Sequence, residues 1–174
     1  MVNSPVDRMA PVAVCLGPMA YEFTLTRRIE FAETDMAGIV HFANFYRMME
    51  NTEHAFFRSL GFSIHGDYDG VHIGWPRVST ACDFFKPLRF EDMVDVQLIV
   101  AEVRNRSIRY GFRFWKTEAG ERVEVARGMV STVCASVDKK AGVIAAVPIP
   151  EVIRAQIIAA PPEMLTIFSP SSAK

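Results

Sequence analysis

Cysteine is scarce in this sequence: Cys15, Cys82 and Cys134 are the only three among 174 residues, and no two of them form a C-x-x-C pair. An odd number of widely spaced cysteines argues against a disulfide framework and against a cysteine-based zinc site. We therefore expect a reducing, cytoplasmic environment and no metal centre.

Long hydrophobic runs and an excess of charge of one sign are also missing. No stretch approaches the roughly 18 consecutive apolar residues that span a bilayer. Asp7 and Arg8 interrupt the N-terminal segment where a signal peptide needs a continuous apolar core. Nineteen Lys and Arg against 20 Asp and Glu give a formal net charge of -1, which provides no general attraction to nucleic acid or to an anionic membrane. We expect neither a membrane span nor a nucleic-acid partner.

Length and composition predict one domain. Half of the 174 residues are hydrophobic, which is enough for one substantial core and not for two. We place this domain at residues 21–160, after a flexible N-terminal tail at 1–20. A C-terminal tail at 161–174, ending in the polar SPSSAK, follows it.

The hydrophobic period changes along the chain. Alternation of apolar and polar residues predicts a strand from Tyr21 to Phe31. A helical period with a wide apolar face follows at 44–60, and Gly61 supplies its C-terminal stop. The glycine-rich stretch 64–76 is predicted to be a loop, with a possible role as substrate cover or subunit contact. Alternation then returns in four segments, at 78–84, 94–100, 108–114 and 123–133. EVIRAQII, at 151–158, predicts a short last helix.

These elements predict an α+β fold. The four later strands are joined by KPLRFED, EVRNRS and EAGER, which are short enough to be hairpins, so the sheet should be antiparallel. No second helix of comparable length is available to cover the long one. We therefore expect a five-stranded antiparallel sheet curled around one long helix.

A single carboxylate, Asp35, precedes that helix by about eight residues. Asp favours helix caps and Asx-turns, and an Asx-turn is one interpretation, although Asp35 is too early to cap the predicted first turn. Gly38 lets the backbone turn tightly. The helix start near Phe42 presents unpaired N–H groups and partial positive charge, which stabilise an oxyanion. A carboxylate beside it can attack a carbonyl or activate water. A thioester suits such a site, because a thiolate, with a thiol pKa near ~8.5, leaves without a positioned acid.

RIEFAETDMAGIVHFANFYRMMENTEHAFF, residues 28–57, closely resembles the signature of hotdog-fold thioesterases of the 4-hydroxybenzoyl-CoA thioesterase family. The signature is Asp, two residues, Gly, two aliphatic residues, an aromatic pair, and then Asn and Tyr-like positions that open the helix. The likeness covers most of residues 21–155. It implies a hotdog fold, in which a five-stranded antiparallel sheet wraps around a long central helix. It also implies homodimers with active sites shared between subunits, often paired as a dimer of dimers.

Carried over residue by residue, the resemblance implies that Asp35 is the catalytic carboxylate, as nucleophile or as general base. It places the oxyanion-binding N–H at Phe42, with Gly38 permitting the preceding turn. The family's contacts to the phosphates of coenzyme A fall at Arg104, Arg106 and Ser107. Guanidinium and hydroxyl groups suit phosphate oxygens, although arginines on turns are often only solvated.

Three further residues are candidates for contact with substrate. A related branch, the Tol-Pal-associated acyl-CoA thioesterases, has Tyr then His where this chain has His41 then Phe42, so His41 either lines the pocket or packs elsewhere. Glu50, on the helix, either acts as a base, as a Glu on this helix does in some hotdog thioesterases, or orders water near Asp35, or pairs with its helical neighbours. Trp75, at a loop end, is a candidate for lining the acyl pocket, whereas Phe84 is expected in the core.

The leading hypothesis is an acyl-CoA thioesterase that acts on an aryl or short acyl group. Coenzyme A is part of its substrate, and no separate cofactor is expected. An enoyl-thioester hydratase or dehydratase on the same fold is an alternative, which needs a histidine beside the carboxylate. A non-catalytic acyl-CoA binding module is the third.

Overall fold

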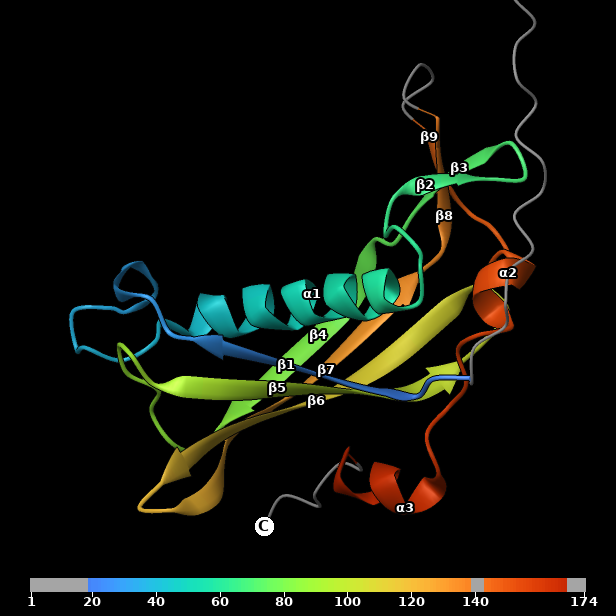
Figure 1. The fold of residues 1–174 in the computed structure, drawn as a ribbon. Coiled ribbons are helices and arrows are strands. Elements are labelled where there is room, and N and C mark those ends of the chain that lie inside the picture. The colour runs from blue at the N-terminus through green and yellow to red at the C-terminus, as the bar shows by residue number, and fades with distance from the viewer. Residues whose placement is uncertain (1–18, 139–142, 169–174) are drawn as a thin grey trace, which may run out of the picture.

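A computed structural model describes residues 19–138 and 143–168 of the chain. Its main sheet has five strands in the order β1-β5-β6-β7-β4, and all neighbours are antiparallel (Figure 1). The strands are β1 (Glu22–Arg28), β4 (Arg77–Phe84), β5 (Met93–Val103), β6 (Ser107–Glu118) and β7 (Glu121–Val133). The predicted α+β fold with a five-stranded antiparallel sheet is confirmed.

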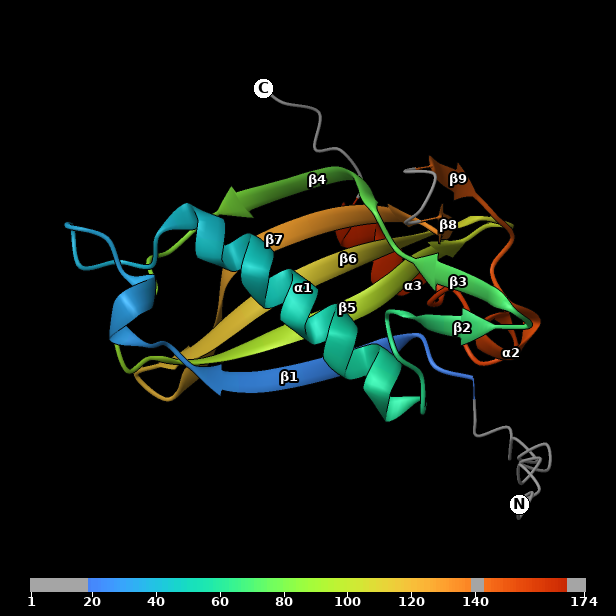
Figure 2. The ribbon, with the colours of Figure 1, turned by 90° about the horizontal axis from the view of Figure 1, so that it is seen from above.

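Helix α1 (Phe42–Ser59) lies across one face of this sheet (Figure 2). Gly61 follows it with φ +82, so the predicted C-terminal stop is confirmed. One side of α1 is buried against the sheet, through Asn44, Phe45, Met48, Met49, Thr52, Glu53, Phe56 and Phe57. Its other side, with Arg47, Asn51 and Arg58, is exposed. Within one chain, the sheet therefore covers one face of the helix.

A glycine in β7 sets how closely α1 approaches the sheet. A Cβ built on Gly128 would run into the Sδ atom of Met49, and Met49 is almost fully buried. Only a residue without a side chain leaves room for this contact, because protein cores are close-packed. Gly128 thus allows the middle of α1 to pack directly on the strand backbone.

A second sheet contains four short strands, in the order β2-β3-β8-β9. They are β2 (Gly66–Tyr68), β3 (Val71–Gly74), β8 (Ala135–Asp138) and β9 (Val143–Ala146). The prediction of a loop throughout 64–76 is therefore wrong. Asp69 and Gly70, both with positive φ, form the turn of a hairpin. Gly74 of that hairpin pairs with Ala135, about sixty residues away, so its strand character depends on a distant partner.

The first strand ends sooner than the alternation predicts. β1 stops at Arg28, and Phe31 starts a single 3-10 turn, η1 (Phe31–Glu33), with its ring 74% exposed. Glu33 holds this turn, because its carboxylate accepts a hydrogen bond from the N–H of Glu30 at 2.9 Å. The prediction that the strand extends to Phe31 is therefore wrong.

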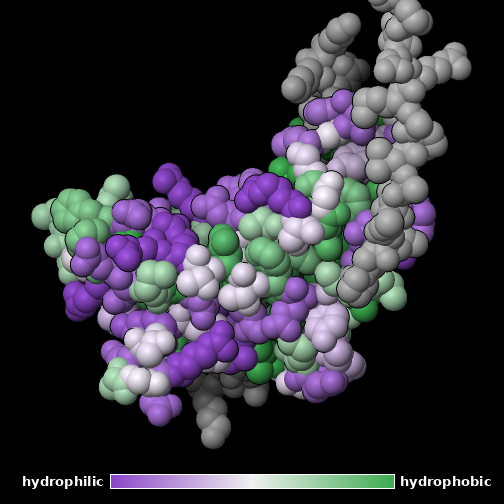
Figure 3. All heavy atoms as spheres, in the orientation of Figure 1, coloured by the Kyte–Doolittle hydropathy of each residue, from purple (hydrophilic) through white to green (hydrophobic). Residues whose placement is uncertain are grey.

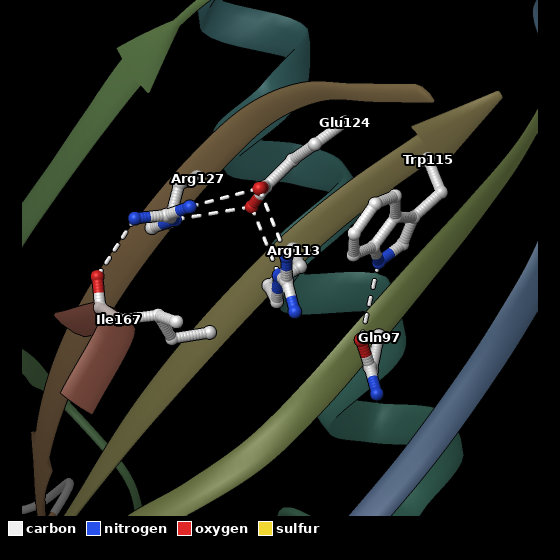
Figure 4. A network of polar contacts seen from close by, with 6 residues as sticks. All are labelled: Gln97, Arg113, Trp115, Glu124, Arg127 and Ile167. Atoms are coloured by element: carbon white, nitrogen blue, oxygen red, sulfur yellow. Dashed lines mark hydrogen bonds and ion pairs between the residues drawn. The ribbon is translucent and has the colours of Figure 1, made fainter. Parts of the chain in front are cut away.

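The last described segment, up to residue 168, lies on the sheet face opposite α1 (Figure 1). The predicted helix at 151–158 is shorter than expected, α2 (Glu151–Arg154), and is followed by α3 (Pro162–Leu165) and the turn η2 (Thr166–Phe168). Arg127 of β7 donates to the carbonyl oxygen of Ile167 at 2.7 Å, and it also holds Glu124 together with Arg113 (Figure 4). The ring of Phe168 occupies the space that a Cβ on Gly111 would need.

Most of the predicted N-terminal tail and the whole SPSSAK segment lie outside the described residues. At the start of the described chain, the N–H of Ala20 donates to the carbonyl oxygen of Gln156 at 2.8 Å. Among residues 19–138 and 143–168, no helix combines the length and apolarity needed to cross a membrane.

Candidate active site

The segment between η1 and α1 is a closed loop that carries Asp35. Thr34 and Val40 form an isolated antiparallel bridge at its base. Inside it, the N–H of Asp35 donates to the carbonyl oxygen of Ile39 at 2.8 Å, and the N–H of Gly38 donates to the carbonyl oxygen of Asp35 at 2.9 Å. Gly38 has φ +72, a left-handed conformation that glycine adopts without steric cost. The backbone therefore fixes where Asp35 stands.

The side chain of Asp35 has one engaged oxygen. Its Oδ1 accepts a hydrogen bond from the N–H of Ala37 at 2.8 Å, which is the Asx-turn that the sequence left as an alternative. Oδ2 makes no hydrogen bond with any part of the chain that the structure describes. Asp35 is exposed in the single chain, so one carboxylate oxygen remains available to a ligand.

Asp35 and Phe42 line the same groove, which has a volume of about 530 Å³. The rest of its lining is mainly apolar and comes from the Asp35 loop, α1, β4 and the β4–β5 connection: Ile39, Val40, Phe45, Phe84, Phe85, Lys86, Pro87 and Leu88. Phe84 is 48% exposed and meets Phe45 edge to face at 4.9 Å. Its expected place in the core is therefore wrong, because Phe84 lies at the end of an edge strand and lines the open groove.

The start of α1, beside this groove, carries a backbone N–H without a partner in the described chain. Phe42 is the first helical residue, and its N–H makes no hydrogen bond within the described chain. His41 is the N-cap, and its Nδ1 accepts from the N–H of Ala43 at 3.3 Å. The His41 ring lies 4.6 Å from that of Phe42 and is not part of the groove lining. His41 thus caps the N-terminal end of α1 and does not line the groove.

Two other predicted contacts lie away from the groove. Glu50 lies farther along α1 and forms an ion pair with Arg77 of β4 at 3.2 Å. Trp75 is only 3% exposed and packs against Phe57 with ring centroids 5.4 Å apart. Its expected role in lining the acyl pocket is not met here, because the indole is part of the core.

A buried carboxyl group beside Glu50 is absent from the sequence interpretation. Glu53 is 1% exposed, and its Oε2 lies 2.5 Å from Nη2 of Arg77. Burial raises the pKa of Glu53 to about 7, although Arg77 acts in the opposite direction. Its Oε1 has no hydrogen-bond partner in the described chain. The signal was present, since Glu53 lies four residues after Met49 on the apolar face of α1.

The predicted phosphate contacts lie at the other end of the sheet from Asp35. Met93 pairs with Arg28, next to the Asp35 loop, and β5 then runs 11 residues before it reaches the turn at 104–107. The ten steps from Met93 to Val103, at about 3.3 Å each, amount to roughly 33 Å. Arg104 pairs with Glu102 at 2.8 Å on that turn, and Arg106 is exposed. One chain therefore does not bring these residues and Asp35 together.

Three groove residues, Lys86, Pro87 and Leu88, were treated in the sequence only as part of a hairpin connection. Their signal is local, because an aromatic pair followed by Lys86 and Pro87 leaves apolar rings on a turn. The same end of the molecule carries further hydrophobic surface, as Figure 3 shows at the loop before α1. There Met36 and Phe90 are exposed, together with the Phe42 ring. The groove thus opens on an apolar surface.

The comparisons with known proteins agree with this geometry. Residues 29–157 match the family described as the thioesterase-like superfamily. The 4-hydroxybenzoyl-CoA thioesterase of Pseudomonas sp. strain CBS-3 is 27% identical over 109 residues, 62% of this chain and 77% of that protein. Its structure superposes with a TM-score of 0.67 at 24% identity, over 78% of this chain and 99% of that one.

Two further relatives act on related compounds by name. A 1,4-dihydroxy-2-naphthoyl-CoA hydrolase of Prochlorococcus marinus strain NATL2A is 26% identical over 106 residues, 57% of this chain and 67% of that protein. The structure of the gentisyl-coenzyme A thioesterase BH1999 is 29% identical, with a TM-score of 0.61, over 76% of this chain and 99% of that one.

Proposed function

Because the chain belongs to the thioesterase-like superfamily and shares the hotdog fold of its relatives, we propose that it hydrolyses an acyl-CoA thioester to a free acid and coenzyme A. Asp35 is the catalytic carboxylate in this proposal, and the N–H of Phe42 binds the oxyanion. The observation that carries it is that both residues line one groove. Coenzyme A is part of the substrate, and the proposed reaction uses no other cofactor.

The proposed chemistry needs one water molecule for each thioester. Either the Asp35 carboxylate attacks the carbonyl carbon to form a mixed anhydride that water then hydrolyses, or it accepts a proton from water as that water attacks. In both routes the C–S bond breaks and the thiolate leaves without a positioned acid. The negative charge that develops on the carbonyl oxygen is met by the Phe42 N–H and by the positive end of α1.

The lining of the groove supports an aryl or short acyl group. Phe45, Phe84 and Leu88 offer apolar and aromatic surface next to Asp35, and aromatic rings pack well against one another edge to face. The relatives named for hydroxybenzoyl, dihydroxynaphthoyl and gentisyl groups support the aryl choice.

We also propose that the site is completed in a homodimer. Strand β4 is an edge of the sheet, and its Val78 is 63% exposed, so a second copy can cover both the strand and the open groove. In a dimer, the turn at 104–107 of one subunit can serve the groove of the other, which removes the separation of roughly 33 Å within one chain. Two such dimers then form the expected dimer of dimers.

The hydratase alternative needs a histidine beside the carboxylate to handle the carbon-bound proton. His41 is the nearest in sequence, and its Nδ1 is engaged as the cap of α1. The binding-module alternative needs no chemistry at Asp35 at all. Both alternatives are separated from hydrolysis by what is released, since only hydrolysis yields free thiol.

The test is Asp35→Asn in a thiol-release assay with a panel of aryl-CoA and short acyl-CoA esters. We expect kcat to fall by at least about a hundredfold while acyl-CoA binding is retained. Asp69→Asn is a matched control, because Asp69 lies on the β2–β3 turn, away from the groove. Full turnover by Asp35→Asn, or hydration of an enoyl-CoA without thiol release by the wild type, contradicts the proposal.

A further inference from the structure

One residue between β1 and α1 makes an unusual number of contacts. The backbone carbonyl oxygen of Glu33 accepts two hydrogen bonds, from the N–H of His41 at 2.9 Å and from Nδ2 of Asn44 at 2.7 Å. Its carboxylate accepts two more, from Nη2 of Arg27 at 2.6 Å and from the N–H of Glu30 at 2.9 Å. Glu33 thus ties the end of β1, the η1 turn and the start of α1 together.

Asn44 is the member of this network that reaches across the loop. It lies in the first turn of α1 and is 9% exposed, so its amide is buried. A buried amide donor without a partner costs about 1 to 3 kcal/mol, and the carbonyl oxygen of Glu33 is the partner that the fold supplies. The contact therefore links α1 to the far side of the loop.

In the sequence, the residues of the Glu33–Asn44 contact lie on either side of the two groups of the proposed site. Glu33 lies two residues before Asp35, and Asn44 lies two residues after Phe42. The Thr34–Val40 bridge closes the loop just inside it. Whatever holds Glu33 against Asn44 therefore limits how far the Asp35 carboxylate can move from the Phe42 N–H.

We propose that Asn44, braced on Glu33 and Arg27, is a positioning residue that fixes the distance between the Asp35 carboxylate and the oxyanion-binding N–H of Phe42. Its catalytic consequence rests on the proposed function. Asn44 does not line the groove, so it acts through the backbone and not on the substrate. A misplacement of about 1 Å between reacting groups costs up to about a hundredfold in rate. The contacts among Arg27, Glu33 and Asn44, here called the brace, therefore affect turnover more than substrate binding.

The test uses Asn44→Asp, which keeps the shape of the side chain and removes the donor. The matched control is Asn51→Asp, the same chemical change at an exposed position of the same helix. We expect kcat of Asn44→Asp to fall at least about tenfold with KM within about threefold, and Asn51→Asp to resemble the wild type. A kcat of Asn44→Asp within twofold of the wild type, or a change in KM alone, overturns the proposal.

A second pair keeps the test decisive if Asn44→Asp folds poorly. Arg27→Met removes the ion pair on the other side of Glu33, and Arg28→Met is its control at an exposed neighbouring position. We expect Arg27→Met alone to lower kcat with KM unchanged, and equal kcat for the two variants contradicts the brace.

Hydrogen exchange separates failure of the brace from failure of the proposed function. Amide exchange in residues 34–42 should accelerate in Asn44→Asp and Arg27→Met and not in their controls, whether or not the protein turns over acyl-CoA. Unchanged exchange ends the positioning proposal. An inactive wild type with accelerated exchange in these variants instead removes only the hydrolase assignment.

Discussion

The buried carboxyl of Glu53 makes the stability of this protein depend on pH in a way that one substitution should remove. Glu53 is 1% exposed between α1 and the sheet, and burial raises its pKa from 4.5 to about 7 despite the adjacent Arg77. The unfolded chain lacks this burial, so there the group titrates near its ordinary value. The proton is therefore held more tightly in the folded state than in the unfolded state.

The sign and size of the effect follow from linkage. Because the pKa of Glu53 is higher in the folded state than in the unfolded state, protonation of Glu53 stabilises the fold. This stabilisation is complete below pH 4.5 and is lost as the pH rises towards about 7. At about 1.4 kcal/mol for each pKa unit, the loss amounts to about 3 kcal/mol. Glu53→Gln places a neutral side chain of the same shape at this position. Relative to the wild type, the variant should therefore gain about 3 kcal/mol in unfolding free energy between pH 4 and pH 8.

The measurement is urea unfolding, followed by circular dichroism at several pH values and at one fixed protomer concentration. Comparing each variant with the wild type at the same pH cancels the titration of all other groups. Glu50→Gln is the control, because Glu50 also pairs with Arg77 and its side chain is 45% exposed. Parallel pH profiles for the wild type and Glu53→Gln would show that the buried carboxyl does not titrate in this range, and the reasoning would fail.

Two more results are expected. Gly38→Ala and Gly120→Ala both force alanine into a left-handed backbone conformation, so each should lose about 1 kcal/mol of stability in urea unfolding. Only Gly38→Ala should also lower kcat, and equal kcat values for the two variants would contradict the role of the Asp35 loop. Burial acts to raise the pKa of Glu124, but hydrogen bonds from Arg113 and Arg127 outweigh it and lower that pKa to about 2. The ionised Glu124 therefore stabilises the fold above pH 4.5, and this stabilisation is lost as the pH falls towards 2. Glu124→Gln should show a shallower acid unfolding profile than the wild type. An unchanged profile would contradict this assignment.

The parts of the fold that the sequence predicted are those that local periodicity determines. The alternation in β5, β6 and β7 and the helical period of α1 need only a residue's near neighbours, so both were identified. The β2–β3 hairpin was missed because its pairing partner is β8, distant in sequence. Phe84 was assigned to the core because alternation shows which face of a strand a side chain occupies and not whether another element covers that face.

The candidate site divides in the same way. Asp35, Gly38 and Phe42 fall within eight residues, so one motif placed them together, and the groove lining agrees with that placement for Asp35 and Phe42. Trp75 is buried against Phe57 of α1, a contact between residues distant in sequence that the pattern around Trp75 does not contain. The placement of Arg104 relative to Asp35 depends on the length of a strand and on the proposed second subunit, neither of which a local motif contains.

The docking of the C-terminal segment bears on where this chain can be shortened. The family match ends at residue 157, whereas the anchors on the outer face of the sheet, at Ile167 and Phe168, come later. Ile99, the cross-strand neighbour of Gly111, is only 1% exposed on that face. A chain that ends at residue 157 would expose the sheet surface around Gly111 and Ile99. It would also remove the carbonyl oxygen of Ile167, to which Arg127 donates a hydrogen bond. Ending an expressed chain at the family boundary would thus expose an apolar surface that the segment after residue 157 covers here.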